Sequence, residues 1–168
     1  MSPSSTARAD ELRALLIRNH ETAELEHWSL GTLYENRGRS FTEGLAARDL
    51  GVSVDIVPPG KRSCHYHLHH AQEEMFIVLE GSGTLRVAGE MLPITRGDII
   101  TIPAGREYPH HILNTSDAPL KYLSISTRRT PEICEYPDSG KVNAYNNGRI
   151  LIQRPANMLD YWDGEPGV

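Results

Sequence analysis

Short apolar runs separated by glycine and proline fill the middle of this sequence of 168 residues. In residues 51–57 apolar and polar side chains alternate, which predicts a strand with one buried face, and Pro58-Pro59-Gly60 ends the run. Residues 75–79 are instead continuously apolar, as in a central strand covered on both faces, and Gly81-Ser82-Gly83 then supplies a turn. Many short antiparallel strands in series predict an all-β sandwich or barrel.

The two ends of the chain differ from this middle. Leu12, Leu15 and Leu16 lie at helical spacing after Ser and Thr residues that could cap a helix, so we expect residues 1–27 to form a short helical extension. Residues 130–168 hold many turn formers and few strand-like runs beyond residues 149–153, which predicts an irregular tail wrapped around the sandwich. The sandwich itself would span residues 28–129, and all three segments would form one domain.

Charge and hydropathy exclude several classes of partner. The formal net charge of -5 offers no basic field to a phosphate backbone, so no nucleic-acid partner is expected. No apolar run approaches the roughly 20 residues of a spanning helix, and the polar start MSPSSTARAD lacks the apolar stretch of a secretory signal. We therefore expect no membrane partner and a cytoplasmic protein, in which Cys64 and Cys134 stay reduced.

Histidines cluster at two places in the sequence, residues 65–70 and residues 110–111. Alternate side chains of a strand share a face, so two of His65, His67 and His69 can chelate one ion. Glu74 begins the next apolar run, where a tight turn would bring its carboxylate beside these histidines. Imidazole with carboxylate suits iron, manganese, nickel, copper or zinc. A further ligand would have to come from the distant histidine pair.

These spacings resemble the two sequence motifs of the cupin superfamily, G(X)5HXH(X)3-4E(X)6G and G(X)5PXG(X)2H(X)3N. The first is matched by His67, His69, Glu74 and Gly81, and the second by Gly97, Pro103, Gly105, His110 and Asn114. The resemblance implies a jelly-roll sandwich, or double-stranded β-helix, that binds one divalent transition metal ion per subunit (Fe, Mn, Zn or Ni). The implied ligands are His67, His69, Glu74 and His110.

Two departures from the motifs leave alternatives open. Six residues separate Gly60 from His67, where the motif has five, and four residues separate Gly105 from His110, where the short form has two. The longer loop puts Tyr108 at the histidine position of the short form, so Tyr108 is a possible pocket residue and His111 an alternative to His110. Asn114 and His111 are otherwise expected to support the ligands from behind.

The likeness extends to the stretches EEMFIVLEGSGTLR, LNTSDAPLKYLSIST, EYPDSGK and YWDGE, which are similar to a subgroup of bacterial single-domain cupins often labelled as sugar-phosphate isomerases. It implies metal-assisted proton transfer on a small polar substrate, such as a sugar or sugar phosphate, with His65, Tyr108 or His111 as general acid or base. An Fe(II)-dependent dioxygenase and a non-enzymatic module that binds a metal and a small molecule remain alternatives. Since small sandwiches often cover their edge strands by pairing, we expect a homodimer with residues 28–45 near its interface.

Overall fold

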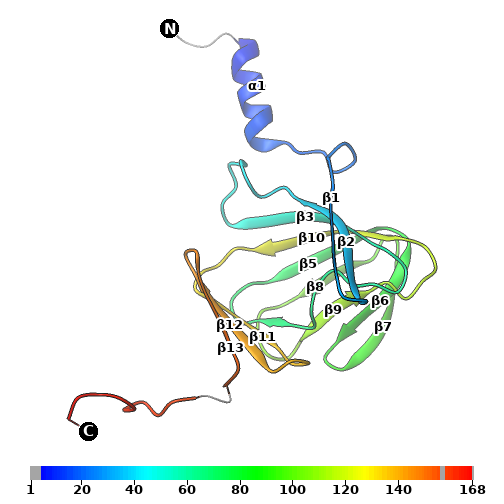
Figure 1. Cartoon of the computed structure of the whole chain (residues 1–168). Helices are drawn as coiled ribbons and strands as arrows, with labels where there is room; N and C mark the ends of the chain where they lie inside the picture. Colours follow the sequence, from blue (N-terminus) through cyan, green and yellow to red (C-terminus); the bar gives the residue numbers. More distant parts are fainter. Residues whose placement is uncertain (1–4, 156–157, 168) are drawn as a thin grey trace.

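One helix and thirteen strands build the residues that the computed structural model describes, 5–155 and 158–167 (Figure 1). They are α1 (Ser5–Leu16), β1 (Glu26–Leu30), β2 (Tyr34–Ser40), β3 (Leu50–Val57), β4 (Leu68–His69), β5 (Glu74–Glu80), β6 (Ser82–Val87), β7 (Glu90–Thr95), β8 (Ile99–Ile102), β9 (His110–Leu113), β10 (Leu120–Thr127), β11 (Glu132–Tyr136), β12 (Lys141–Asn146) and β13 (Arg149–Gln153). The expected all-β jelly roll with a short N-terminal helix is thereby confirmed. α1 is not long and apolar enough to cross a membrane, and the described residues contain no other helix.

Three antiparallel sheets make up the sandwich. The largest has the strand order β1-β2-β3-β10-β5-β8, and the other two have the orders β7-β6-β9 and β13-β12-β11-β4. An isolated bridge between His67 and His110 ties the region before β4 to β9. The core between the sheets is a cluster of buried apolar side chains that includes Phe76, Val78, Ile112 and Tyr122.

The strands expected at residues 51–57 and 75–79 are β3 and β5. Val54 and Val57 of β3 are both buried although they point to opposite faces, and Val52 is half-buried, so the expectation of a single buried face is wrong. After β5 the chain turns at Gly81, whose φ is +81°. A Cβ atom there would lie 2.4 Å from the carbonyl oxygen of Pro119, so this turn needs glycine.

The C-terminal region is more regular than the sequence indicated. The expectation of an irregular tail is wrong for residues 132–146, which form β11 and β12, whereas the strand-like run at residues 149–153 forms β13. β11 pairs with β4 through Cys134 opposite His69 and Glu135 opposite Leu68. This pairing joins segments about 65 residues apart, which local patterns cannot reveal. The division of the chain at residues 27 and 130 stays a prediction.

Candidate metal centre

Three strands bring the four expected ligands to one place. His67 and His69 enter at β4, Glu74 is the first residue of β5, and His110 is the first residue of β9. Reciprocal backbone hydrogen bonds between His67 and His110, of 3.1 and 2.7 Å, hold β9 against the chain before β4. The i, i+2 spacing of His67 and His69 places both rings on the inner side, as the strand period requires.

The side chains converge on one carboxylate oxygen. The Nε2 atoms of His110, His67 and His69 lie 2.8, 3.4 and 3.5 Å from Oε2 of Glu74. All four side chains are largely shielded from solvent, His110 almost completely. The ligand atoms of His67, His69 and Glu74 all lie within 4.8 Å of one another, so this cluster could hold a metal ion.

Hydrogen bonds of the Nδ1 atoms fix the ring orientations of His67 and His110. Nδ1 of His67 lies 2.8 Å from the carbonyl oxygen of His65, and Nδ1 of His110 lies 3.0 Å from that of Tyr108. A carbonyl oxygen only accepts, so each Nδ1 carries a hydrogen, and each ring turns its Nε2 toward Glu74. Either a proton on Nε2 or a metal cation can bridge these nitrogens and the carboxylate. The residues therefore fit a divalent metal bound by imidazole and carboxylate.

The pKa shifts of the expected ligands agree with a site that binds a cation. Burial alone would lower the pKa of His67, but hydrogen bonds with Cys64 and Glu74 outweigh it and raise the pKa to about 11. Burial would raise the pKa of Glu74, yet hydrogen bonds with His110 and His67 hold it well below its usual value. For His69 burial prevails and lowers the pKa. The centre thus keeps a carboxylate anion and favours positive charge beside it.

A carboxylate from β11 supports the ligands from behind. Glu132 is 5% exposed and accepts backbone N–H hydrogen bonds from His70, Ala71 and Gln72 at 2.9, 3.1 and 2.8 Å. Its Oε1 also lies 3.4 Å from Nδ1 of His69, which makes no hydrogen bond. Glu132 therefore holds the loop between His69 and Glu74. Nothing in its sequence surroundings pointed to this role.

A cavity of about 290 Å³ opens beside the cluster. Its walls are Cys64, His65, His67, His69, Gln72, Glu132, Cys134, Tyr136, Asn143 and Tyr145. The ring of His65 lies between those of Tyr34 and Tyr136, at centroid distances of 5.0 and 5.6 Å. Half of the walls come from β11 and β12, a region that the sequence had indicated to be irregular. The only signal for them was the stretch EYPDSGK, which contains Tyr136.

The other expected site residues lie outside the cluster. Tyr108 has a 40% exposed side chain, does not line the cavity and offers its carbonyl to His110. Asn114 is buried and donates hydrogen bonds to the carbonyls of Val57 and Ala118, at 2.8 and 2.7 Å, which holds the turn after β9. His111 is also buried; burial, followed by nearby arginines, lowers its pKa to about 4. Both of its ring nitrogens lack hydrogen-bond partners.

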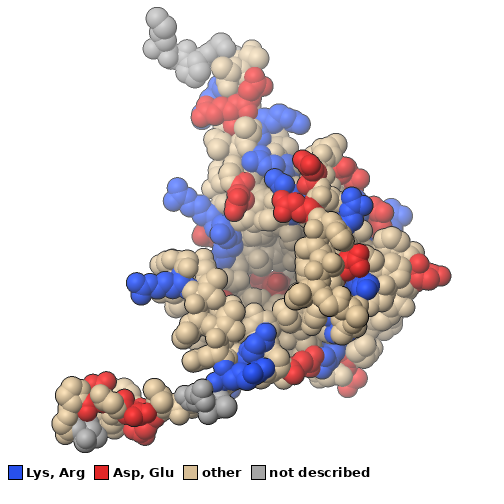
Figure 2. Space-filling view, in the orientation of Figure 1, with Lys and Arg blue, Asp and Glu red and all other residues tan. Residues whose placement is uncertain are grey.

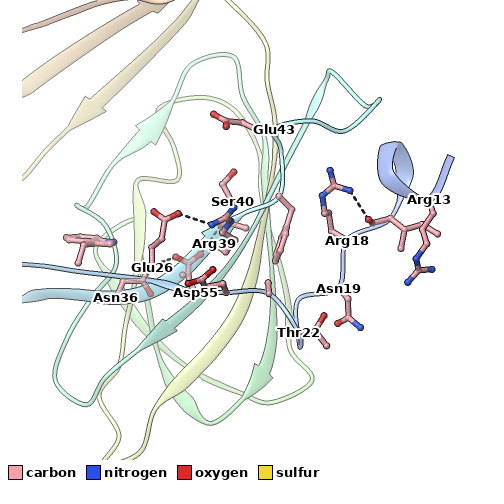
Figure 3. A pocket seen from close by; sticks show the side chains of 17 residues that line it. Arg13, Arg18, Asn19, Thr22, Glu26, Asn36, Arg39, Ser40, Glu43 and Asp55 are labelled. Carbon is pink, nitrogen blue, oxygen red and sulfur yellow. Dashed lines mark hydrogen bonds and ion pairs between the residues drawn. The ribbon is translucent and has the colours of Figure 1, made fainter. Parts of the chain in front are cut away.

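A larger cavity of about 860 Å³ lies elsewhere, where the end of α1 and the following loop face β1, β2 and β3 (Figure 3). Two of its arginines have partners within the chain: Arg39 contacts Glu26 at 3.0 Å, and Arg18 donates to the carbonyls of Ala14 and Ile17. None of the four expected ligands lines it. The larger cavity is therefore separate from the cluster of expected ligands.

Comparison with known proteins agrees with this description. The sequence profile of the Cupin domain matches residues 53–126. A crystal structure from Acidithiobacillus ferrooxidans, provisionally named a sugar phosphate isomerase, is 30% identical and covers 88% of this chain and 97% of that one, with a TM-score of 0.78. The structure named sugar phosphate isomerase from a cupin superfamily, from Silicibacter pomeroyi, is 24% identical, covers 86% and 96%, and has a TM-score of 0.72.

Curated relatives match over a shorter span. The oxalate-binding protein of Thermotoga maritima is 32% identical over 69 residues, which are 41% of this chain and 54% of that protein. An uncharacterized protein of Methanocaldococcus jannaschii is 38% identical over 71 residues, 42% of this chain and 54% of the relative. The chain thus spans about half the length of these curated relatives. The fold, the motif residues and the near-complete match to the Acidithiobacillus protein together identify this chain as a member of the cupin family.

Proposed function

We propose that this cupin is a metalloenzyme that acts on a small polar molecule by metal-assisted proton transfer, in the manner of a sugar or sugar phosphate isomerase. The observation that carries the proposal is the convergence of three imidazole nitrogens on one carboxylate oxygen beside a cavity. His67, His69, Glu74 and His110 would hold one divalent ion, Fe, Mn, Zn or Ni. Bound there, the ion would polarise a carbonyl or hydroxyl oxygen of the substrate.

His65 is the protein group best suited to move the proton. It lines the cavity, and burial, followed by the charges of Lys141 and His67, lowers its pKa. A neutral imidazole at physiological pH can accept a proton from a substrate carbon or hydroxyl. Contacts with Tyr34 and Tyr136 restrict the orientation of the ring. Burial raises the pKa of Tyr136 to about 12, so its phenol stays protonated and can donate a hydrogen bond to the substrate.

The names of the two similar crystal structures support an isomerase, and that of the Thermotoga relative supports a second candidate. In this second function the same centre would bind a small dicarboxylate without catalysing a reaction. Carboxylate oxygens are suitable ligands for the open positions of a site that has only four protein ligands. A dioxygenase would use the same open positions for oxygen, but no observed contact favours it over proton transfer.

The test combines metal analysis with turnover. We expect gently purified protein to contain one transition metal ion per chain and to interconvert an aldose and its ketose under anaerobic conditions. His65→Gln should keep the metal and lose at least about 100-fold in turnover, because general base catalysis contributes that much. His27→Gln, on an exposed strand, is the matched control. Iron with substrate-dependent oxygen uptake would favour the dioxygenase, and tight oxalate binding without turnover would favour the binding module.

A further inference from the structure

The chain exposes more surface than a compact monomer of its mass. Its accessible surface is 11277 Å² for a mass of 18.8 kDa. Folded monomers of this mass expose about 8,300 Å² by the scaling of area with mass. The excess of about 3,000 Å² is comparable with the area that obligate homodimers bury. An exposed area of this size is sufficient for an interface with another protein chain.

Part of this surface belongs to a C-terminal arm, which we define as residues 158–162. It projects from the sandwich (Figure 1). Met158, Leu159 and Tyr161 are 82, 74 and 84% exposed, and Trp162 is 57% exposed. Among the described residues, the aromatic ring packed against that of Tyr161 is that of Trp162, at 4.9 Å between centroids. Tails that stay solvated are poor in aromatic and large aliphatic residues, whereas four of these five residues are of those kinds. The composition of the arm is typical of a segment that is buried against a partner.

A groove of about 600 Å³ with mainly apolar walls lies on the sheet that precedes the arm. Its walls, the C-terminal groove, include Ile133, Ala144, Ile150 and Leu151. β13 is the outer strand of its sheet, and all five of its residues are exposed. An apolar edge strand left in this state invites pairing with another chain. The arm and the groove therefore both expose apolar surface that each could bury against the other.

The charges of the arm and of the groove are complementary as well. Residues 158–165 carry Asp160, Asp163 and Glu165 and no lysine or arginine, and acidic groups are visible on this segment in Figure 2. Arg149 lies in the wall of the groove and makes no ion pair within the described residues. The arm follows β13 in the sequence and lies away from the sandwich (Figure 1).

We propose that the C-terminal arm of each chain docks in the C-terminal groove of a second copy, so that the protein is an arm-exchanged homodimer. Each chain offers one arm and one groove, and a two-fold axis satisfies both pairs in a closed assembly. The inference does not depend on the metal chemistry. It differs from the expectation that residues 28–45 form the interface.

The first test is the association state of the full chain. Sedimentation velocity should give twice 18.8 kDa at micromolar concentrations. Trp162→Ala should raise the dimer dissociation constant by about 30-fold or more, as for a buried aromatic anchor at an interface. Met91→Ala, an exposed apolar side chain on β7, is the control and should leave the constant unchanged. A monomer at these concentrations, or a dimer that Trp162→Ala does not weaken, would overturn the proposal.

The second test distinguishes exchange from folding back. A chain with Leu151→Cys is mixed with a differently tagged chain with Leu159→Cys under mild oxidation, and the unaltered chain reports any crosslink of the native cysteines. Exchange predicts a disulfide between the two tagged chains. If a chain that carries both substitutions instead closes the bond within itself, the arm serves its own groove and the proposal is wrong.

Discussion

Replacing Glu132 with alanine tests how far β11 organises the metal centre. The buried carboxylate accepts three backbone hydrogen bonds, from His70, Ala71 and Gln72. A hydrogen bond to a charged group contributes about 1.5–3 kcal/mol, and an N–H left without an acceptor costs more if buried. Because the loop is partly open to solvent, water can replace part of what is lost. We expect the free energy of unfolding to fall by about 3 kcal/mol.

The same substitution should weaken metal binding. The loop that Glu132 holds connects His69 to Glu74, and its carboxylate lies 3.4 Å from Nδ1 of His69. Loss of such an outer partner reduces metal affinity by about 10–100-fold. Urea unfolding with chelator in every sample measures stability without a contribution from bound metal, and titration calorimetry with Mn²⁺ measures affinity.

Glu135→Ala is the matched control on the same strand. Glu135 is less buried and forms side-chain ion pairs with Arg106 and His70, at 2.6 and 2.7 Å. Pairs near the surface are worth about 0–1 kcal/mol, so this variant should lose little stability and no metal affinity. If the two variants behave alike, or if Glu132→Ala keeps native stability and affinity, then Glu132 does not organise the centre.

Three further predictions follow from the geometry. His67→Ala should lose the metal and keep its fold, as checked by metal content and circular dichroism, because a core of this size does not need the ion. Gly81→Ala should lower the free energy of unfolding by about 3 kcal/mol, since its Cβ would collide with the Pro119 carbonyl. Gly89→Ala, also at positive φ but in open space, should lower it by about 1 kcal/mol. Equal losses of the two variants in urea unfolding would show that the collision does not matter. Burial raises the pKa of Asp55, so its contribution to stability is present below the unfolded-state pKa and is lost as pH rises through the folded-state value. Asp55→Asn should therefore resist urea better than the native chain at pH 8 and similarly at pH 4, and equal midpoints at both pH values would contradict this reasoning.

Local patterns predicted the strands and the chelating pair because both depend on short-range geometry. The period of two places His67 and His69 on one face wherever the strand lies, and a turn between two short strands returns Glu74 to them. The lengthened loop before His110 left a choice among neighbouring residues, and the structure brings His110 to Glu74, with Nε2 2.8 Å from Oε2. Adjacent side chains of a strand point to opposite faces, so His111 is directed elsewhere.

The C-terminal region shows the limit of such reasoning. Its polar and turn-forming residues resemble a loop, yet β11 is stabilised as a strand by pairing with β4. This pairing gives the cavity Tyr136 and Asn143 and gives the loop its Glu132 acceptor. β-propensity depends on such context, since a strand gains its hydrogen bonds and buried area from a partner.

The sequence by itself determined the all-β class, the turn at Gly81 and the ligand spacing within one strand, because each is set by the conformation of a few consecutive residues. Only the tertiary structure decided which distant strand closes the metal cavity and which carboxylate holds its loop. Those outcomes depend on the register between strands far apart in the chain. Register is selected by the burial and hydrogen bonding of whole sheets, which no local pattern contains.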